Sequence, residues 1–413
     1  MTVIDSIKKT HKAAGSLRTA SDMQVKGVLL SLAKLLENNT PLILKANQKD
    51  VTKQDAANPR TDRLMLNEQR IQNIANSLRQ VSNLPNPANK IIEKRKLKNG
   101  LSLKKINVPL GVVGAIYESR PNVTYDIAAL CIRSQNACIL KGSSEAEQSN
   151  LIAIRLIKQA LKENNISPDA VTLLPVEREV VQELFTATKY VDVLIPRGSN
   201  GLIEYVRKNS LVPVIETGAG VCHVYVEKEG DIAKAVNIVV NARVSRPSVC
   251  NSADAVLVDK EIAVPFLQRL HPEFKKYGVE IFADTASYKI LKDYPHLHKA
   301  TPEDFGKEFL SLKCAIKVVK GFDAALEHIA TYSTKHSEAI VTKNKKQAQQ
   351  FLQEVDAAAV YWNASTRFTD GEEFGLGAEI GISTQKLHAR GPFALEKLVT
   401  EKWIVEGNGQ IRV

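Results

Sequence analysis

The sequence predicts an α/β protein with two doubly wound parallel-sheet domains and a small additional sheet. From Leu110 onward, short apolar runs alternate with helical stretches, and a second alternating series begins after Glu216. Strands that alternate with helices are typical of parallel sheets covered by helices on both faces. A chain of 413 residues has room for two or three such packed units, so a single small module is excluded.

Helical periodicity dominates the first 80 residues. Ser21 and Gln24 have the spacing of a capping box at a helix start. An apolar stripe at helical spacing follows, formed by Val25, Val28, Leu29, Leu32, Leu35 and Leu36. We therefore expect this region to be helical and to belong to the first domain.

Residues 91–107 predict a β-hairpin, because Asn99-Gly100 is a strong turn signal between two extended stretches. The tail at 397–413 is also extended in character, and we expect it to pair with the hairpin as the small sheet. An isolated two-stranded ribbon is marginal in water. The hairpin and the tail are therefore predicted to assemble a homo-oligomer.

The remaining elements are expected in two groups. The first group comprises strands at 111–117, 137–140, 171–174, 191–195 and 212–215, with helices at 127–134, 145–164 and 179–186. The second comprises strands at 255–258, 315–319 and 357–361, with helices at 232–243, 264–276 and 324–332.

The charge balance favours an anionic partner. Lys and Arg number 56 against 45 Asp and Glu, a formal net charge of +11. Nucleic acid and a phosphorylated small molecule both fit. However, the densest basic run, at 90–105, has no interleaved aromatic residues that could stack on bases. Lysines on exposed edge strands, which discourage wrong pairing, account for that run better.

Other global features limit the class of protein. The sequence lacks an apolar stretch long enough for a membrane span and a secretory leader, which predicts a cytoplasmic protein without a membrane partner. Five cysteines, an odd number without framework spacing, predict free thiols in a reducing compartment. The motifs CxxC and HExxH are absent, so we expect no metal site.

Two loops follow predicted strands and open predicted helices, one with Lys141 and Ser143 and the other with Gly198 and Ser199. Helix N-termini at the carboxyl ends of parallel strands favour anions such as cofactor phosphates. Gly and Ser are also ordinary residues in such turns. The dinucleotide fingerprint GxGxxG is absent.

Three further residues are candidates for chemistry. Cys250 lies in a polar loop close in sequence to Arg243 and Arg246, which favours a thiolate nucleophile, although a bystander thiol fits as well. Glu216 precedes a Gly-rich turn that could direct a carboxylate into a cleft, or it is a solvated turn residue. Asn122 could donate to a developing oxyanion, or act as a turn former or helix cap.

Together these residues resemble the aldehyde dehydrogenase superfamily. The resemblance is carried by residues 108–116, Lys141, Gly198-Ser199, Glu216-Thr217-Gly218 and Cys250, in this order and spacing. More specific stretches resemble the branch that reduces an acyl phosphate of glutamate, namely residues 117–124, 221–226, 246–251, 336–340 and 383–392. The match extends over nearly the whole chain.

This resemblance implies an oxidoreductase of proline biosynthesis. The implied reaction is the NADPH-dependent reduction of L-glutamate 5-phosphate to L-glutamate 5-semialdehyde with release of phosphate, through a thioester on Cys250. It implies an NADP-binding domain at 1–90 and 108–217, a catalytic domain at 218–396, and an oligomerisation sheet at 91–107 and 397–413. A complex with glutamate kinase is an open partner expectation.

The resemblance also implies roles for individual residues. The cofactor-binding residues are Lys141, Ser143, Gly198, Ser199 and Glu308. Beyond the resemblance, we expect Arg120 and Arg390 to bind the substrate's phosphate or carboxylate, because a guanidinium group suits both anions. Asn122 is the expected oxyanion donor. Glu216 matches the carboxylate that activates water in hydrolytic relatives, so we expect it to be turned away from the thioester, to be hydrogen-bonded to its own Gly-rich turn, or to act only as a proton relay.

Two other functions remain alternatives. One is a hydrolysing NAD(P)-dependent aldehyde dehydrogenase with another substrate class. The other, outside enzymes, is a basic nucleic-acid-binding protein.

Overall fold

The computed structural model describes residues 2–54, 61–118, 120–218 and 220–412. The chain divides into two compact units. Unit 1 comprises Met1–Thr217, Gly375–Gly381 and Pro392–Val413, and unit 2 comprises Gly218–Phe374 and Ile382–Gly391. In the part of the chain that is described, no helix is both long and apolar enough to cross a membrane.

Unit 1 begins with helices, as predicted. They are α1 (Val3–Arg18), α2 (Asp22–Asn38), α3 (Thr40–Val51), α4 (Thr61–Leu64) and α5 (Glu68–Asn83). The capping box at the start of α2 is confirmed, because the Ser21 hydroxyl accepts from the Gln24 N–H and the Gln24 side chain accepts from the Ser21 N–H. The predicted apolar stripe of α2 is buried, apart from Leu35, which is half-buried.

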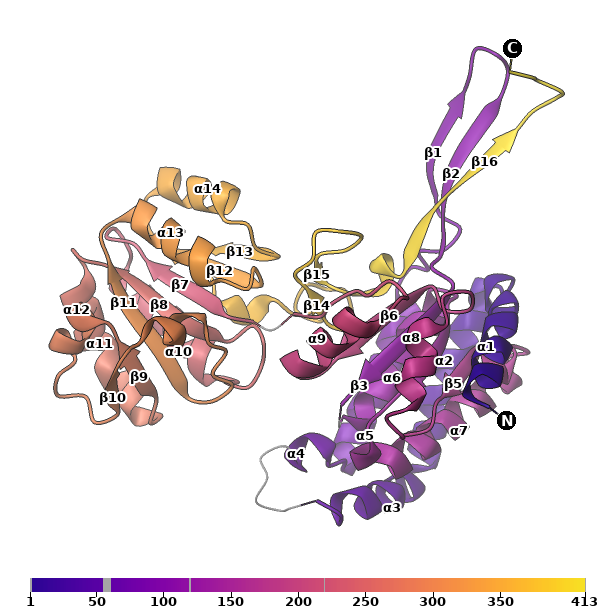
Figure 1. Ribbon diagram of the computed structural model, residues 1–413, viewed down its shortest axis with the longest axis horizontal. Helices are drawn as coiled ribbons and strands as arrows, with labels where there is room; N and C mark the ends of the chain where they lie inside the picture. The colour runs from indigo at the N-terminus through magenta and orange to yellow at the C-terminus, as the bar shows by residue number, and fades with distance from the viewer. Residues whose placement is uncertain (1, 55–60, 119, 219, 413) are drawn as a thin grey trace. The chain divides into compact units, whose positions relative to one another are not determined.

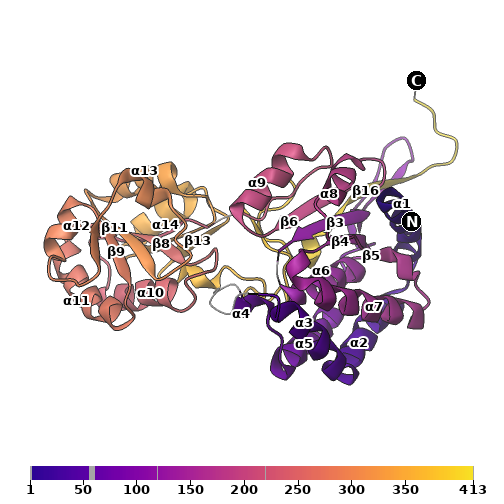
Figure 2. The same ribbon diagram turned by 60° about the horizontal axis from the view of Figure 1, so that its bottom comes forward.

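A four-stranded parallel sheet forms the centre of unit 1 (Figure 2). Its order is β5-β4-β3-β6, with β3 at Val112–Tyr117, β4 at Ala137–Lys141, β5 at Val171–Leu173 and β6 at Val193–Arg197. The connecting helices are α6 (Pro121–Arg133), α7 (Glu147–Glu163), α8 (Val180–Thr186) and α9 (Asn200–Asn209). Helix α6 begins six residues before the expected start because Pro121, with its fixed φ, opens it.

The strand expected at 212–215 is a wrong prediction. Only an isolated bridge joins Val214 to Leu194, with Leu194 N–H donating to the Pro213 carbonyl at 2.8 Å and Ile215 N–H donating to the Leu194 carbonyl at 2.9 Å. Pro213 has no N–H, so it cannot contribute a donor to a continuous ladder.

The small antiparallel sheet is present in unit 1. Strand β1 (Ile91–Lys96) pairs with β2 (Ser102–Pro109), and β2 pairs with β16 (Val399–Glu406), so the order is β1-β2-β16 (Figure 1). Gly100 adopts a φ of 89° in the predicted hairpin turn. The C-terminal strand thus completes a sheet that begins 300 residues earlier in the sequence.

Unit 2 contains a seven-stranded parallel sheet of order β10-β9-β11-β8-β7-β12-β13. Its strands are β7 (Cys222–Val226), β8 (Ala253–Asp259), β9 (Glu280–Ala283), β10 (Leu297–Lys299), β11 (Lys313–Val319), β12 (Ser337–Val341) and β13 (Ala359–Trp362). Its helices are α10 (Ile232–Val244), α11 (Ala263–Lys276), α12 (Thr285–Ile290), α13 (Phe322–Tyr332) and α14 (Lys345–Glu354).

Both faces of the unit 2 sheet are covered by helices, as Figure 1 shows. Val224 on β7 faces a core built with α10 and α11, whereas its neighbour Tyr225 faces a core that includes Phe322 of α13 and Phe351 of α14. Consecutive residues of one strand point to opposite faces, so a strand that is covered on both faces is mostly apolar.

Short elements complete the chain. The 3₁₀ turns are η1 (Ser144–Ala146), η2 (Pro168–Ala170), η3 (Pro302–Gly306), η4 (Thr366–Phe368) and η5 (Leu395–Lys397). Strands β14 (Ile382–Ser383) and β15 (Gly391–Pro392) form a two-stranded sheet.

Candidate active site

The loop after β4 borders a cavity in unit 1. Gly142 packs closely there, since a Cβ would lie 2.3 Å from Nδ2 of Asn150 and would displace that side chain. Lys141 Nζ donates to the carbonyls of Gly142 (3.1 Å) and Val176 (3.0 Å), and burial lowers the pKa of this lysine. The loop is therefore held close to the end of β5 by a lysine side chain.

The cavity has a volume of about 460 Å³. Its walls include Gly142 of this loop, apolar residues such as Leu151 and Ile154 of α7, and residues 172–176, which form the end of β5 and the segment that follows it. Charged side chains of both signs line it, namely Lys9, Arg155, Lys158, Glu147 and Asp169, and Lys158 Nζ lies 3.7 Å from Asp169 Oδ1. An apolar cavity with cations and a tight glycine at a strand end fits the adenosine part of a phosphorylated nucleotide.

The loop after β6 holds an internal carboxylate. Ser199 is the N-cap residue of α9, and its N–H and hydroxyl both donate to Glu118, at 2.9 and 2.7 Å. A Cβ on Gly198 would lie 2.7 Å from Cδ of Glu118. Glu118 thus lies where a helix N-terminus favours an anion. The sequence reasoning assigned no role to this residue.

Asn122 lies in the first turn of α6, where its Nδ2 donates to Asp126 Oδ2 at 3.0 Å. Burial raises the pKa of Asp126 to about 6, against the opposing effects of Arg197 and of this hydrogen bond. The bond orients the amide, and a primary amide carries a second N–H. Arg120 is the N-cap residue of the same helix.

Glu216 has an arginine neighbour within unit 1. Its Oε1 lies 3.8 Å from Nε of Arg207 on α9, and 24% of the Glu216 side chain is exposed. The residue follows a segment without a regular strand, contrary to the expectation for residues 212–215.

Cys250 lies in unit 2, in the turn between α10 and β8, and it is half-buried. Its carbonyl accepts a hydrogen bond from the Cys222 thiol at 3.2 Å. Gly220 approaches the same carbonyl so closely that a Cβ would lie 1.5 Å from the oxygen. The backbone of Cys250 is therefore held from the side of β7, while its thiol belongs to a partly exposed residue.

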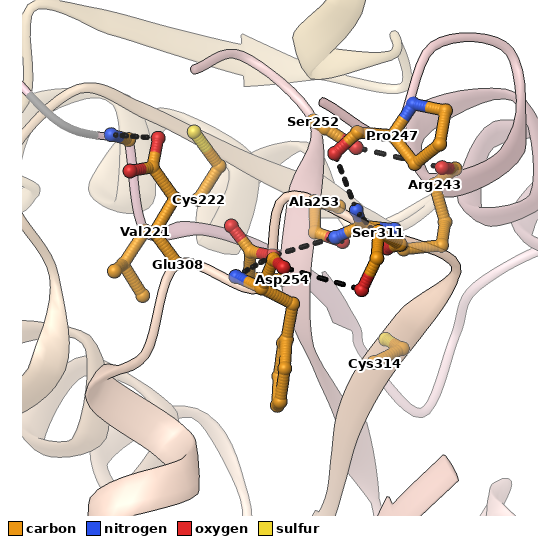
Figure 3. A network of polar contacts seen from close by, with 12 residues as sticks. Val221, Cys222, Arg243, Pro247, Ser252, Ala253, Asp254, Glu308, Ser311 and Cys314 are labelled. Carbon is orange, nitrogen blue, oxygen red and sulfur yellow. Dashed lines mark hydrogen bonds and ion pairs between the residues drawn. The ribbon is translucent and has the colours of Figure 1, made fainter. Parts of the chain in front are cut away.

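A buried ion pair fixes the segment around Cys250 (Figure 3). Arg243 Nη1 donates to Asp254 Oδ1 at 2.6 Å and to the Ala253 carbonyl at 3.0 Å. Its Nη2 donates to the carbonyls of Pro247 (2.7 Å) and Ser311 (2.6 Å). Arg243 was expected to favour the Cys250 thiolate. In the structure, Arg243 instead forms an ion pair with Asp254.

Glu308 lies near the start of β7. Its Oε1 accepts from Gly220 N–H at 3.1 Å, and burial raises the pKa of its carboxyl (Figure 3). The next residue, Phe309, donates its N–H to Asp254 Oδ1 at 3.1 Å. The segment that carries Glu308 is thus tied to the same ion pair as the Cys250 turn.

Arg390 forms an ion pair within unit 2. Its Nη1 lies 2.7 Å from Asp356 Oδ1, and its Nη2 donates to the Asp356 carbonyl at 3.1 Å. Lys335 and Lys386 also lie within 3.2 Å of the same carboxylate. Hydrogen bonds from Arg390 and Lys386 hold the pKa of Asp356 far below its usual range.

A row of buried polar side chains lies behind the Cys250 turn, and sequence reasoning did not identify it as part of the site. His336 Nδ1 lies 3.8 Å from the Cys222 sulfur and 2.8 Å from the Ser337 hydroxyl. Ser337 Oγ lies 2.6 Å from Thr369 Oγ1. The backbone carbonyl of Thr369 accepts a hydrogen bond from Asn251 Nδ2 at 2.9 Å. The sequence feature that could have indicated this row is the His336-Ser337-Glu338 stretch, in which three polar residues lie directly before and at the start of the short buried strand β12.

Comparison with known proteins now identifies the chain. A family model described as the aldehyde dehydrogenase family matches residues 1–287. With the two doubly wound sheets and the half-buried cysteine ahead of β8, this match defines an oxidoreductase of the aldehyde dehydrogenase type, a family that uses nicotinamide cofactors.

More specific relatives cover the full length. Gamma-glutamyl phosphate reductase of Chlorobium chlorochromatii is 50% identical over 413 residues, which is 99% of each chain. The Bacteroides fragilis enzyme of that name is 48% identical over 415 residues and covers 100% of both. The crystal structure of the Thermotoga maritima enzyme superposes with a TM-score of 0.95 at 41% identity, again over 100% of both chains. The chain belongs to the gamma-glutamyl phosphate reductase family.

The glycine at position 220 provides a test of how the Cys250 turn is held. We expect Gly220→Ala to displace Cys250, because the new Cβ would overlap backbone atoms that cannot rotate away. A displacement of about 1 Å in a reacting group costs on the order of 100-fold in turnover. Steady-state rates measure this effect. Gly306→Ala is the matched control, because its Cβ would meet only Tyr332 at 3.5 Å; equal rates for both variants would contradict the expectation.

His336 predicts a specific pH dependence of stability. Burial lowers its pKa from 6.5 to about 4, so the folded chain keeps it neutral while the unfolded chain takes up a proton below pH 6.5. The stability that this group supports is lost as the pH falls from 6.5 toward 4. Between pH 7.5 and 5 the loss is about 2 kcal/mol.

Urea unfolding of the wild type and of His336→Gln at both pH values isolates this contribution. Other groups with shifted pKa values, such as Asp254 and His328, titrate in both chains and cancel in the difference. The stability difference between wild type and variant should fall by about 2 kcal/mol at pH 5. A difference that does not change with pH would contradict the buried neutral state of His336.

Proposed function

We propose that this chain reduces L-glutamate 5-phosphate to L-glutamate 5-semialdehyde with NADPH and releases phosphate, the second step of proline synthesis from glutamate. The observation that carries the proposal is the full-length likeness to gamma-glutamyl phosphate reductases, at 50% identity over 413 residues. The net charge of +11 suits an anionic substrate and cofactor.

Cys250 is the proposed nucleophile. Its thiolate attacks the acyl carbonyl, the bond from the carbonyl carbon to the phosphate oxygen breaks, and the electron pair leaves with the phosphate. The acyl group is then a thioester on Cys250. Hydride addition to the thioester carbonyl gives a tetrahedral thiohemiacetal anion, whose oxygen re-forms the carbonyl as the C–S bond breaks, so that the aldehyde and the Cys250 thiolate are released. Asn122 is the proposed oxyanion donor, supported by the bond to Asp126 that orients its amide.

NADP(H) is the proposed cofactor, and it supplies the hydride when bound. The cavity beside Lys141 and Gly142 supports binding of its adenosine part, and the cations Lys9 and Arg155 support a 2′-phosphate, whereas Lys158 is ion-paired with Asp169. Ser143, which follows Gly142 in the same loop, is also a proposed cofactor-binding residue. Gly198 and Ser199 are the proposed pyrophosphate loop, in which a bound phosphate would take the place of the Glu118 carboxylate. Glu308 is the proposed partner of the nicotinamide ribose.

Glu216 is proposed not to act as a general base. Its Oε1 lies 3.8 Å from Nε of Arg207, so the carboxylate already has a cationic neighbour within unit 1. A base beside the thioester would activate water and convert the acyl enzyme to glutamate, whereas reduction requires that water stay unactivated.

Arg120 and Arg390 stay proposed substrate residues; for Arg390, binding requires that the Asp356 ion pair be opened or shared.

A homo-oligomer in the cytoplasm is proposed as the working form. Strands β1 and β16 are the two edges of the small sheet, and both expose large apolar residues: Ile91, Ile92, Trp403 and Val405. Unpaired edges with apolar side chains are surfaces that another chain can cover. A complex with glutamate kinase stays a prediction.

Phosphate-dependent oxidation of glutamate semialdehyde with NADP⁺ tests the reaction. We expect wild-type turnover to require phosphate, Cys250→Ala to abolish turnover, and Glu216→Gln to retain activity within about tenfold, since no water need be deprotonated. Loss of a true general base costs on the order of 100-fold or more. The absorbance of NADPH measures the rate. Phosphate-independent turnover with a collapse in Glu216→Gln would favour a hydrolytic aldehyde dehydrogenase instead.

Removal of residues 400–413 tests the assembly. This deletion takes away nearly all of β16, so we expect the oligomer seen by light scattering at micromolar concentration to dissociate. Removal of residues 407–413 is the control, because these residues lie beyond the strand and should leave the mass unchanged. A monomeric full-length chain would show that the sheet does not assemble copies.

A further inference from the structure

Arg367 is tied to the residue that follows the proposed nucleophile. It lies in η4, and its Nη1 donates to the side-chain oxygen of Asn251. Asn251 Nδ2 donates in return to the carbonyls of Arg367 (3.3 Å) and Thr369 (2.9 Å), and its own carbonyl accepts from Thr366 Oγ1 at 2.7 Å. Four hydrogen bonds therefore hold the turn with Arg367 against the Cys250 loop.

The direct partners of the Arg367 guanidinium are neutral. Besides Asn251, its Nε donates to the Ser245 hydroxyl at 3.1 Å. Among the described residues, no carboxylate lies within ion-pair distance of Arg367 or of Arg246. Arg367 is half-buried and Arg246 is exposed. A partly desolvated guanidinium without a contacting anion is electrostatically incomplete.

The electrostatic surroundings include both signs. Burial lowers the pKa of Arg367 most, and the like charge of Arg246 lowers it further. Asp370, Cys250 and Glu373 oppose this and raise it. The Cys250 thiol is thus close enough to interact with the charge of Arg367, although no carboxylate of the described residues contacts the Arg367 guanidinium directly.

Two other arginines of unit 2 are already committed. Arg243 is ion-paired with Asp254 and buried, and Arg390 is ion-paired with Asp356. Arg367 and Arg246 therefore remain as the guanidinium groups beside the Cys250 turn that can accept an anionic ligand without breaking an ion pair.

We propose that Arg367, supported by Arg246, forms a phosphate-binding subsite next to Cys250. The subsite receives the phosphoryl group of the acyl phosphate and, in the reverse direction, inorganic phosphate. This inference rests on the proposed function, because only an acyl phosphate carries a phosphoryl dianion that is joined through one bridging oxygen to the carbonyl carbon that the thiolate attacks. A planar guanidinium binds two phosphate oxygens at once and neutralises the charge that the leaving group gains.

Kinetics of the reverse reaction test this assignment. Arg367→Gln should raise the KM for inorganic phosphate by roughly 10- to 100-fold, the loss expected for charge-assisted hydrogen bonds. Arg367→Lys keeps the charge without the fork and should fall in between. The KM values for semialdehyde and NADP⁺ should stay within about twofold. Arg269→Gln, which removes an exposed arginine from α11, controls for the change in net charge.

The same measurements separate phosphate from the substrate carboxylate. A rise in the KM for semialdehyde, with that for phosphate unchanged, would assign Arg367 to the carboxylate and overturn the proposal. A uniform loss of kcat with both KM values unchanged would leave only a structural role for Arg367 and would also overturn it.

Alkylation of Cys250 by iodoacetamide tests the subsite without turnover, because the other four cysteines are buried. We expect inorganic phosphate to slow alkylation of the wild type saturably and to leave Arg367→Gln unaffected. The pH at which alkylation is half-maximal should also rise in Arg367→Gln, since a cation near the thiol is lost.

The two experiments fail in different ways. Phosphate protection that depends on Arg367 in a chain without reductase activity would refute the proposed function and leave the subsite standing. Equal protection of wild type and Arg367→Gln in an active enzyme would refute the subsite alone. Thermal unfolding of each variant confirms that the folded chain is being compared.

Discussion

The buried pair of Arg243 and Asp254 is the interaction on which the geometry of the proposed catalytic turn depends. Neither side chain can reach water, so each charge must be satisfied inside unit 2. Arg243 meets this requirement by binding carbonyls on both sides of Cys250, at Pro247 and Ala253, and one on a separate segment, at Ser311. Removal of one partner of such a pair costs about 3–5 kcal/mol. The end of α10, the start of β8 and the Glu308 segment are thereby locked together.

A second constraint is steric. The carbonyl of Cys250 lies so close to Gly220 that its position is fixed from the β7 side, and the Cys222 thiol donates to the same oxygen. On the opposite side, Asn251 is bonded to η4. The backbone of the turn is thus restrained by segments that lie up to about 120 residues away from it in sequence.

Local patterns explain what could be predicted. The helix start at Ser21, the hairpin at Asn99-Gly100 and the long apolar runs of β8 and β11 rest on neighbouring residues, and sequence alone predicts such features. Strands β9 and β10 have only four and three residues, too few for a period. Strand β12 begins with Ser337 and Glu338, which are buried because His223, Ser333 and Thr369 satisfy them. Two of those partners are distant in sequence, since His223 is 115 residues from Glu338 and Thr369 is 32 residues from Ser337. Three other contacts could not be predicted from the sequence for the same reason: the ion pair of Arg243 with Asp254, the hydrogen bonds of Ser199 to the Glu118 carboxylate, and the hydrogen bonds between Asn251 and the η4 turn.

The discontinuity of unit 1 has a consequence for synthesis on the ribosome. Asn136 donates to the carbonyl of Leu398 at 2.8 Å, and β2 waits for β16 as its second neighbour. Both partners leave the ribosome only after the 157 contiguous residues of unit 2, Gly218–Phe374, have been made. A nascent chain can therefore complete unit 2 first, while β2 still presents an open edge. Contacts over such sequence separations form slowly, and an unpaired strand is the region most exposed to association with other nascent chains during that interval.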